Sequence, residues 1–167
     1  IKEFKFEEDS WDLRKFQKGT RQLTANFNFG PSWYREKVKK YIYFLLNSGY
    51  ASGTVIGYIG TFRSFSQIIQ KYHLKQPKDI EREIIRQYID SQISIASKTL
   101  RTRLKFLRDF FEWLGLESEV LMKKRDYPKV TFSDPDWLDE TARDAIQKNL
   151  FKIPEPIARQ YQIQSYT

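Results

Sequence analysis

The sequence predicts a mainly α fold, in which a four-helix bundle follows a small N-terminal β-hairpin. From Pro31 onward, apolar residues recur every three or four positions, in segments separated by glycine and proline. Before Pro31 the period is two, because Leu23, Ala25, Phe27 and Phe29 alternate with polar residues, which is typical of a strand. A hydrophobic content of 40%, with 16% aromatic residues, is enough to fill a core and excludes a disordered chain.

Glycines and helix-starting residues set the expected helix bounds at about 31–48, 52–72, 81–92 and 96–115. Pro31 suits a first helical turn, and Gly49 and Gly115 suit positions just past a helix end. Ser52 or Thr54, and Ser97, are candidate N-caps, and the fourth helix should bury the apolar stripe Leu100, Leu104, Leu107, Phe111 and Leu114.

Two glycines, Gly57 and Gly60, lie inside the second predicted helix. Each costs about 1 kcal/mol of helix propensity relative to alanine. They indicate a close approach by another group, either a neighbouring helix or DNA, and helix packing is the favoured cause.

The N-terminal and C-terminal segments differ from the helical region in the spacing of their apolar residues. In the hairpin, the 23–29 strand is expected to pair with Lys2–Phe6, with a turn near Gly19. Residues 116–136 lack a sustained period and read as a linker, and Asp139 is expected to cap a helix over about 140–150. The expected division is therefore 1–30, 31–116, 117–136 and 137–167.

Charge and cysteine content narrow the partner and the compartment. The net charge of +8 and the pI near 9.5 favour an anionic partner, with nucleic acid ahead of a membrane surface. The absence of cysteine excludes disulfides and thiolate metal sites and fits a reducing cytoplasm. No segment is long and apolar enough to span a bilayer, and no cofactor is expected.

The fourth predicted helix carries cations on the side opposite its apolar stripe. Lys98, Arg101, Lys105 and Arg108 fall at spacings of three and four, and no acid occurs between Gln92 and Asp109. Like charges at these spacings repel, so such a face implies a counter-charge from outside the chain. Phosphate supplies that charge, and a helix fits the major groove of DNA. The alternative is an ordinary solvated face.

Other residues join this candidate surface. Thr99 and Thr102 add short hydroxyl donors, and the first helix offers a second basic cluster of Arg35, Lys37, Lys39 and Lys40, relieved only by Glu36. Ser52 and Thr54 stand at a helix N-terminus, which can bind phosphate, although either could be only a cap. The expected DNA-binding residues are Lys98, Thr99, Arg101, Thr102, Lys105, Arg108, Ser52, Thr54, Arg35, Lys39 and Lys40.

No catalytic constellation emerges from the chain. His73 is the only histidine, so neither a histidine-based metal site nor a conventional triad can form, and a surface or helix-end position is expected for it. The acids Asp134, Asp136, Asp139 and Glu140 fit helix capping better than metal binding. There is no glycine-rich phosphate loop.

Several segments, in this order and spacing, resemble the tyrosine recombinase (phage integrase) family. They are Thr54-x-x-x-Tyr58 with Phe62 and Phe65, Ser97–Leu100 through Phe110–Leu114, Trp137–Thr141, and Ile157–Thr167. The segment Trp11-Asp12-Leu13-Arg14 is similar to transposon-encoded members. Where relatives often carry polar or charged residues, this chain has Ile56, Gly57, Ile59 and Gly60.

The resemblance implies a SAM-like core-binding domain followed by the truncated start of a catalytic domain. In the family these two domains clamp duplex DNA, the proteins assemble as homo-oligomers on it, and a tyrosine cleaves and rejoins strands with help from arginines, lysine and histidines. The first catalytic arginine is expected just past Thr167. We therefore expect the chain to bind DNA, with its long basic helix facing the major groove, and to cleave none, in a cytoplasmic protein associated with the bacterial nucleoid.

Three other readings compete with this one. The chain could be a helical DNA-binding regulator without a catalytic half, which would be expected to complete its last helix. It could be a protein-interaction module whose basic face meets an acidic protein. A peripheral membrane protein is the least favoured, because an apolar face beside the cations is lacking.

Overall fold

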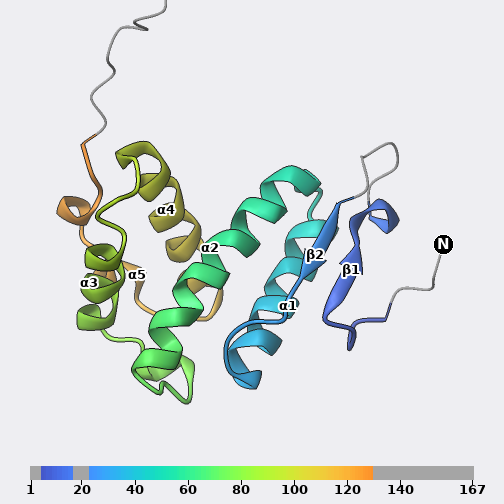
Figure 1. Cartoon of the computed structure of the whole chain (residues 1–167), viewed down its shortest axis with the longest axis horizontal. Coiled ribbons are helices and arrows are strands. Elements are labelled where there is room, and N and C mark those ends of the chain that lie inside the picture. Colours follow the sequence, from blue (N-terminus) through green and yellow to red (C-terminus); the bar gives the residue numbers. More distant parts are fainter. Residues whose placement is uncertain (1–4, 17–22, 130–167) are drawn as a thin grey trace, which may run out of the picture. The chain divides into compact units, whose positions relative to one another are not determined.

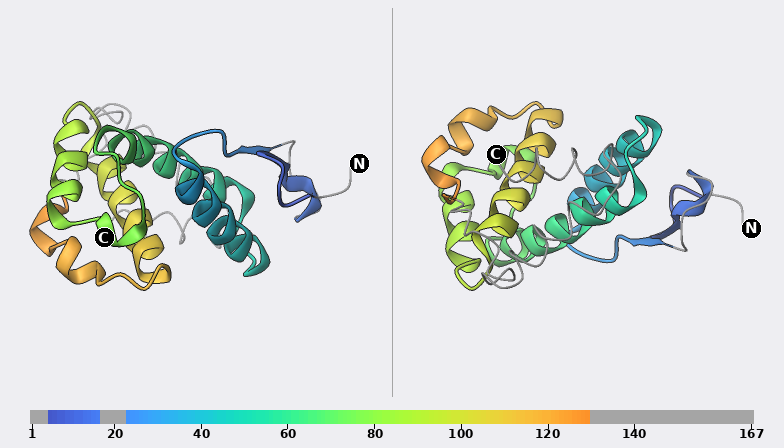
Figure 2. Two further views of the ribbon diagram at one scale, coloured as in Figure 1. Left: turned by 90° about the horizontal axis from the view of Figure 1, so that it is seen from below. Right: turned by 90° about the horizontal axis from the view of Figure 1, so that it is seen from above.

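The computed structural model describes residues 5–16 and 23–129, which form a β-hairpin and a helical body (Figure 1). The hairpin lies at one end, α1 and α2 occupy the middle, and α3, α4 and α5 gather at the other end in all views (Figures 1 and 2). The elements are β1 (Ser10–Asp12), β2 (Thr24–Asn26), α1 (Ser32–Asn47), α2 (Ser52–Lys71), α3 (Arg82–Ser91), α4 (Ser97–Trp113) and α5 (Ser118–Leu121). Short 3₁₀ turns cover Leu13–Lys15, Pro77–Asp79 and Lys124–Asp126. None of the described helices is long and apolar enough to cross a membrane.

The four predicted helices are confirmed to within two residues at most ends. Gly49 and Gly115 follow α1 and α4 with φ of +83° and +75°, a conformation that glycine adopts without strain. The expected starts differ in detail. Pro31 is the N-cap of α1 and not its first residue, while Ala51 and Ala96 are the N-caps of α2 and α4 and provide no side-chain cap.

Aromatic rings on α2 connect the other helices. The Phe62 ring lies 4.7 Å from that of Phe110 on α4, and the Phe65 ring lies 5.3 Å from that of Tyr88 on α3. Tyr34 of α1 is fully buried and donates its hydroxyl proton to the Phe62 carbonyl oxygen at 3.0 Å. The rings therefore bring α1, α3 and α4 onto one helix, which fixes the orientation of the α4 surface.

The predicted hairpin is confirmed, but its first strand lies elsewhere. β1 pairs antiparallel with β2, with Trp11 opposite Ala25, and the Trp11 side chain is buried. The sequence instead proposed Lys2–Phe6 as the first strand. Lys5 and Phe6 are described and lie outside any strand, because the large apolar surface of Trp11 selects which segment pairs. Gly19 lies outside the described residues.

The predicted linker is packed against the body in the part that the structure describes. Leu121 and Met122, in and after α5, are buried. Both guanidinium amino groups of Arg82 on α3 donate to the Asp126 carboxylate, at 2.9 and 3.0 Å. A four-residue helix is too short to show a period in the sequence, so this segment read as a linker. Residues 130–167, with the expected 140–150 helix, lie outside the described residues.

Candidate nucleic-acid interface

Three cations of α4 project from the helix without an acidic partner. Lys98, Arg101 and Lys105 are exposed, and among the described residues none of them makes an ion pair. The opposite side of the helix is held in the core by Leu104 and Leu107, which are fully buried. Because that buried side fixes the rotation of α4, the three cations are presented to solvent together.

The two remaining cations of α4 have partners within the chain. The half-buried Arg108 lies 3.6 Å from Glu112 and 3.9 Å from Asp109, so its charge is partly balanced. The guanidinium of Arg103 donates to the side-chain oxygen of Gln92 near the end of α3. Gln92 is neutral and leaves the charge of Arg103 in place, although it directs the group toward α3. The strongest part of the cationic face is therefore the first three turns of α4.

Two hydroxyl groups lie among these cations. Thr99 is exposed, as expected for a residue that could reach a phosphate or a base. The Thr102 hydroxyl donates to the Lys98 carbonyl oxygen at 3.1 Å, one turn back along the helix. Its oxygen keeps acceptor capacity, while its proton is already used.

Two predicted cations of α1 share one acidic partner within the chain. The Lys39 ammonium lies 2.8 Å from one Asp9 carboxylate oxygen, and Arg35 donates to the other at 3.0 Å. Lys39 also donates to the Glu7 carbonyl oxygen at 2.9 Å, and its side chain is only 7% exposed. The hydrogen bond from Lys39 lowers the pKa of Asp9. These groups attach the segment before β1 to α1, and the single Asp9 carboxylate offsets one of the two positive charges.

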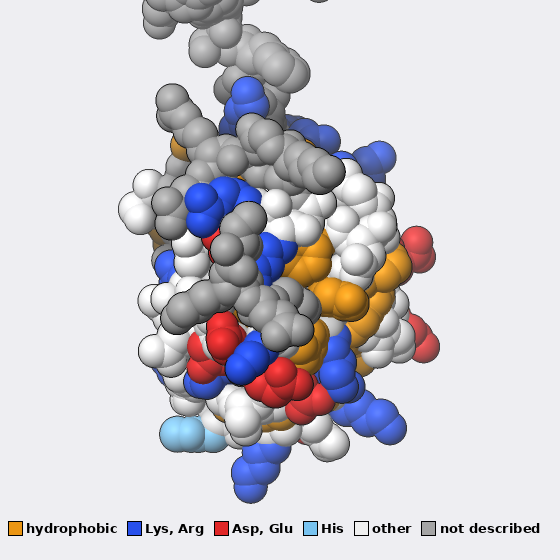
Figure 3. Space-filling view, turned by 90° about the vertical axis from the view of Figure 1, so that its right-hand side faces the viewer, with side chains coloured by type: hydrophobic (Ala, Val, Ile, Leu, Met, Phe, Trp, Pro, Cys, Tyr) orange, Lys and Arg blue, Asp and Glu red, His pale blue; other side chains and the backbone are white. Residues whose placement is uncertain are grey.

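The other residues proposed around α1 and the start of α2 differ in exposure. Lys40 is exposed and pairs with Glu36 at 2.7 Å, one turn away on α1. At the hairpin end of the molecule, acidic and basic side chains lie side by side (Figure 3). Ser52 is buried, whereas Thr54 is exposed at the start of α2. The structure thus separates most of the predicted cations into an exposed α4 group without acidic partners and an α1 group whose members pair with Asp9 or Glu36.

Sequence reasoning missed one cation, Arg63 on α2. It is exposed, donates to the Asn26 carbonyl oxygen of β2 at 3.1 Å, and lies 5.6 Å from the centre of the Phe29 ring. A signal was present in the sequence, because no acid occurs between Glu36 and Asp79. Arg63 has no other cation near it in the sequence, so it belongs to no basic cluster.

The two internal glycines of α2 have different surroundings. A Cβ atom at Gly57 would come within 3.3 Å of the Phe106 ring of α4, so helix packing accounts for this glycine. A Cβ atom at Gly60 would meet nothing within 4 Å. Packing was the favoured cause for both, and it holds for Gly57 alone.

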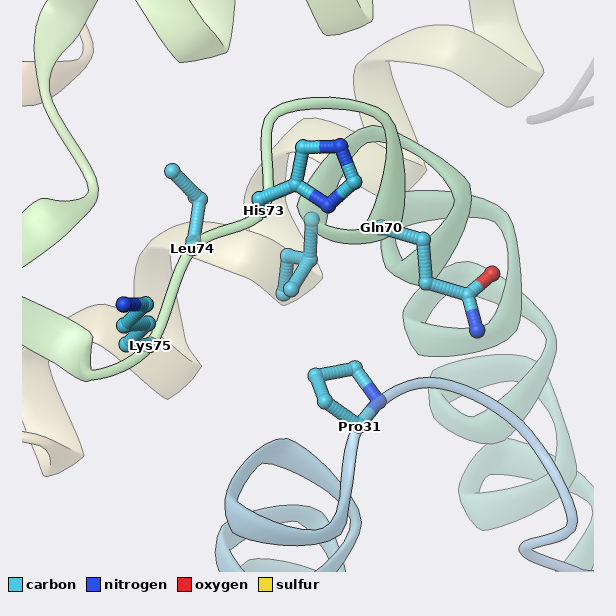
Figure 4. Close-up of a pocket in the computed structure, with 6 residues that line it drawn as sticks. Pro31, Gln70, His73, Leu74 and Lys75 are labelled. Carbon is cyan, nitrogen blue, oxygen red and sulfur yellow. The ribbon is translucent and has the colours of Figure 1, made fainter.

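His73 lies just after α2, at a helix end on the surface as expected, with φ of +52°. It borders a shallow depression with Pro31, Gln70, Leu74 and Lys75 (Figure 4). The labelled side chains do not converge on a common point (Figure 4). The acids Asp134, Asp136, Asp139 and Glu140 lie outside the described residues.

The sequence is similar to one family model and to curated transposases. The sequence model of the phage integrase N-terminal SAM-like domain matches residues 38–118. Transposase B from transposon PsiTn554 of Staphylococcus aureus is 26% identical over 171 residues, which cover 92% of this chain and 27% of the transposase. Transposase B from transposon Tn554, from two strains of the same species, is 25% identical over the same shares. No solved structure shows significant similarity to the chain.

Proposed function

We propose that the chain binds duplex DNA as part of a recombinase. The match of residues 38–118 to the phage integrase N-terminal SAM-like domain supports this proposal. The observation that carries the proposal is the row of exposed, uncompensated cations Lys98, Arg101 and Lys105 on α4. Their spacing covers two turns of one helix, and the width of a helix suits the major groove.

The contacts divide into two kinds. Lys98, Arg101 and Lys105 neutralise phosphates, which gives affinity without sequence preference. Thr99 and Thr102 lie on the same exposed side and are short enough to reach base edges or phosphates. Arg108 and Thr54 extend the surface. Lys40, Arg35, Lys39 and Ser52 remain proposed contacts that would require their present partners or their burial to change.

The role of the whole protein reaches further than this chain, which spans 27% of the length of the transposases it matches. We propose that the whole protein cleaves and rejoins DNA at specific sites, in integration, excision or transposition, with the catalytic groups elsewhere than in this chain. Assembly as a homo-oligomer on DNA and a place at the bacterial nucleoid are part of the same proposal. So is the division into a DNA-binding domain over 31–116 and a further domain from 137.

The test is a DNA titration across a salt series, with Arg101 and Lys105 both replaced by alanine. Because each phosphate contact contributes about −0.9 to the slope of log K against log salt, the double variant should flatten the slope by about 2 and weaken binding. A matched double variant at the exposed residues Lys75 and Lys78, after α2, removes the same charge and should change the slope much less. Circular dichroism confirms that both variants stay folded.

Two results would contradict the proposal. Failure of the unaltered chain to bind duplex DNA at low salt would rule out DNA binding by this chain. Equal effects of the α4 pair and the control pair would show that only total charge matters and would remove α4 as the specific surface.

A further inference from the structure

We infer that the duplex-binding surface extends from α4 across α2 to the N-terminal hairpin, where Arg63 and the exposed polar residues of β2 bind the sugar–phosphate backbone. This inference rests on the proposed DNA binding and assigns a role to a hairpin that lies outside residues 38–118.

One side of α2 carries no acidic residue. Gly53, Gly57, Gly60, Arg63 and Gln67 are all exposed and recur at spacings of three and four, so they lie along one side of the helix. A solvated helix face usually mixes acids and bases, as α3 does. The only charge in this set is positive, which makes the side compatible with a polyanion close to the helix.

This side of α2 adjoins α4. The position of a Gly57 Cβ atom is 3.3 Å from the Phe106 ring. On α4, Phe106 follows Thr102 by four residues and Thr99 by seven, so the three lie on the same side of the helix. The exposed side of α2 therefore continues into the threonine-bearing edge of the cationic α4 face.

Arg63 is held in place by two neutral groups. Its guanidinium donates to the carbonyl oxygen of Asn26 and lies over the Phe29 ring. Both partners are neutral, so the positive charge is not cancelled. The side chain is nevertheless ordered at the junction of α2 and β2, and binding a phosphate there costs less conformational entropy than it would for a free surface arginine.

The hairpin strand that contacts α2 is β2, and its exposed side chains are polar and uncharged. Thr24 and Asn26 of β2 and Asn28 just after it are exposed, and amide and hydroxyl groups are common ligands of phosphate oxygens. Asp12, the one acidic residue of β1, receives two hydrogen bonds from Arg14 Nε, at 2.9 and 3.0 Å. Repulsion from the Asp12 carboxylate is therefore balanced locally.

The partner that fits is a stretch of duplex backbone crossing from α4 over α2 to β2. A duplex presents a continuous row of phosphates, and this surface offers cations at both ends with small or uncharged residues between them. An acidic protein surface would need acids spaced to match the distance between the α4 cations and Arg63. A duplex of any sequence presents phosphates along that whole distance.

The experiment uses the 167-residue chain and a labelled duplex of random sequence in a salt series. Arg63→Met keeps the stem that packs near Phe29 and removes the charge, and Arg63→Lys restores a charge without the planar group. Arg63→Met should flatten the salt slope by about 1, as expected for one lost phosphate contact, and Arg63→Lys should recover most of that loss. Lys105→Met serves as the reference for an α4 contact.

A second variant does not depend on the packing of Arg63. Asn28→Asp places a negative charge at an exposed position just after β2 and should weaken binding, with a loss that grows as salt is lowered. Gln87→Glu on α3 introduces the same charge on a helix outside this surface and is the control; because Gln87 donates to Glu83 at 3.2 Å, its melting temperature shows what the lost hydrogen bond costs. Circular dichroism and the melting temperature are recorded for every variant.

The outcomes separate this inference from the proposed function. If Lys105→Met weakens binding while Arg63→Met and Asn28→Asp match Gln87→Glu, the hairpin extension is wrong and DNA binding through α4 stands. If Lys105→Met has no effect either, the α4 surface and its extension both fail. Weakening by both hairpin-side variants beyond the control supports the extension.

Discussion

Replacing Gly60 with alanine should make the protein more stable. Gly60 lies inside α2, is exposed, and leaves open space where a Cβ atom would stand. Alanine therefore adds helix propensity with no steric penalty, and the expected gain is about 1 kcal/mol in the free energy of unfolding. For a folded unit of about 130 residues, this gain corresponds to a rise of about 3–5 °C in Tm.

Gly57→Ala is the matched control on the same helix. Its new methyl group would meet the Phe106 ring at 3.3 Å, and that ring is stacked on Tyr58 with a centroid distance of 3.8 Å. The propensity gain is offset by displacement of this stack, so Gly57→Ala should be less stable than Gly60→Ala. Thermal and urea unfolding measure both variants. Equal gains, or a loss at Gly60, would refute the described rotation of α2 against α4.

Three further perturbations probe other contacts. Leu104→Ala should cost about 2–5 kcal/mol in chemical denaturation, since the side chain is fully buried, and no cost would contradict the buried side of α4. Arg82→Ala should cost about 2–3 kcal/mol and speed hydrogen exchange around Asp126, because a half-buried bidentate pair is lost. Hydrogen bonding from Lys39 lowers the pKa of Asp9 below 3.8, so the pair stabilises the hairpin above that pH and is lost as pH falls through the lowered value. The indole N–H resonance of Trp11 should report this loosening, and a spectrum unchanged to pH 2 would exclude the pair as a stabilising contact.

The helices with a sustained apolar repeat could be predicted from the sequence. The four helices and the glycines that end two of them followed from spacing alone, because each helix buries one continuous side. Phe110 is absent from the buried stripe expected for the fourth helix, although it is fully buried. The sequence cannot show that several helices surround α2, so α1 and α4 bury wider arcs than a single stripe predicts.

Side-chain pairing between distant segments was not readable. The cations of α4 could be identified because their partners would have been neighbours on the same helix. Lys39 has its partner Asp9 thirty residues earlier, and only the folded hairpin brings the two together. Arg63 was missed for the converse reason, since its isolation in the sequence concealed its place beside β2.

The Arg82–Asp126 pair also closes a loop that runs from α3 through α4 and α5. Its two partners stand 44 positions apart, so one bidentate contact holds both ends of this segment together. Because the ends are fixed, the segment after α5 cannot leave α3 unless both hydrogen bonds break. Loss of the pair would therefore make this segment the first part of the helical body to open, without changing any residue of the cationic α4 face.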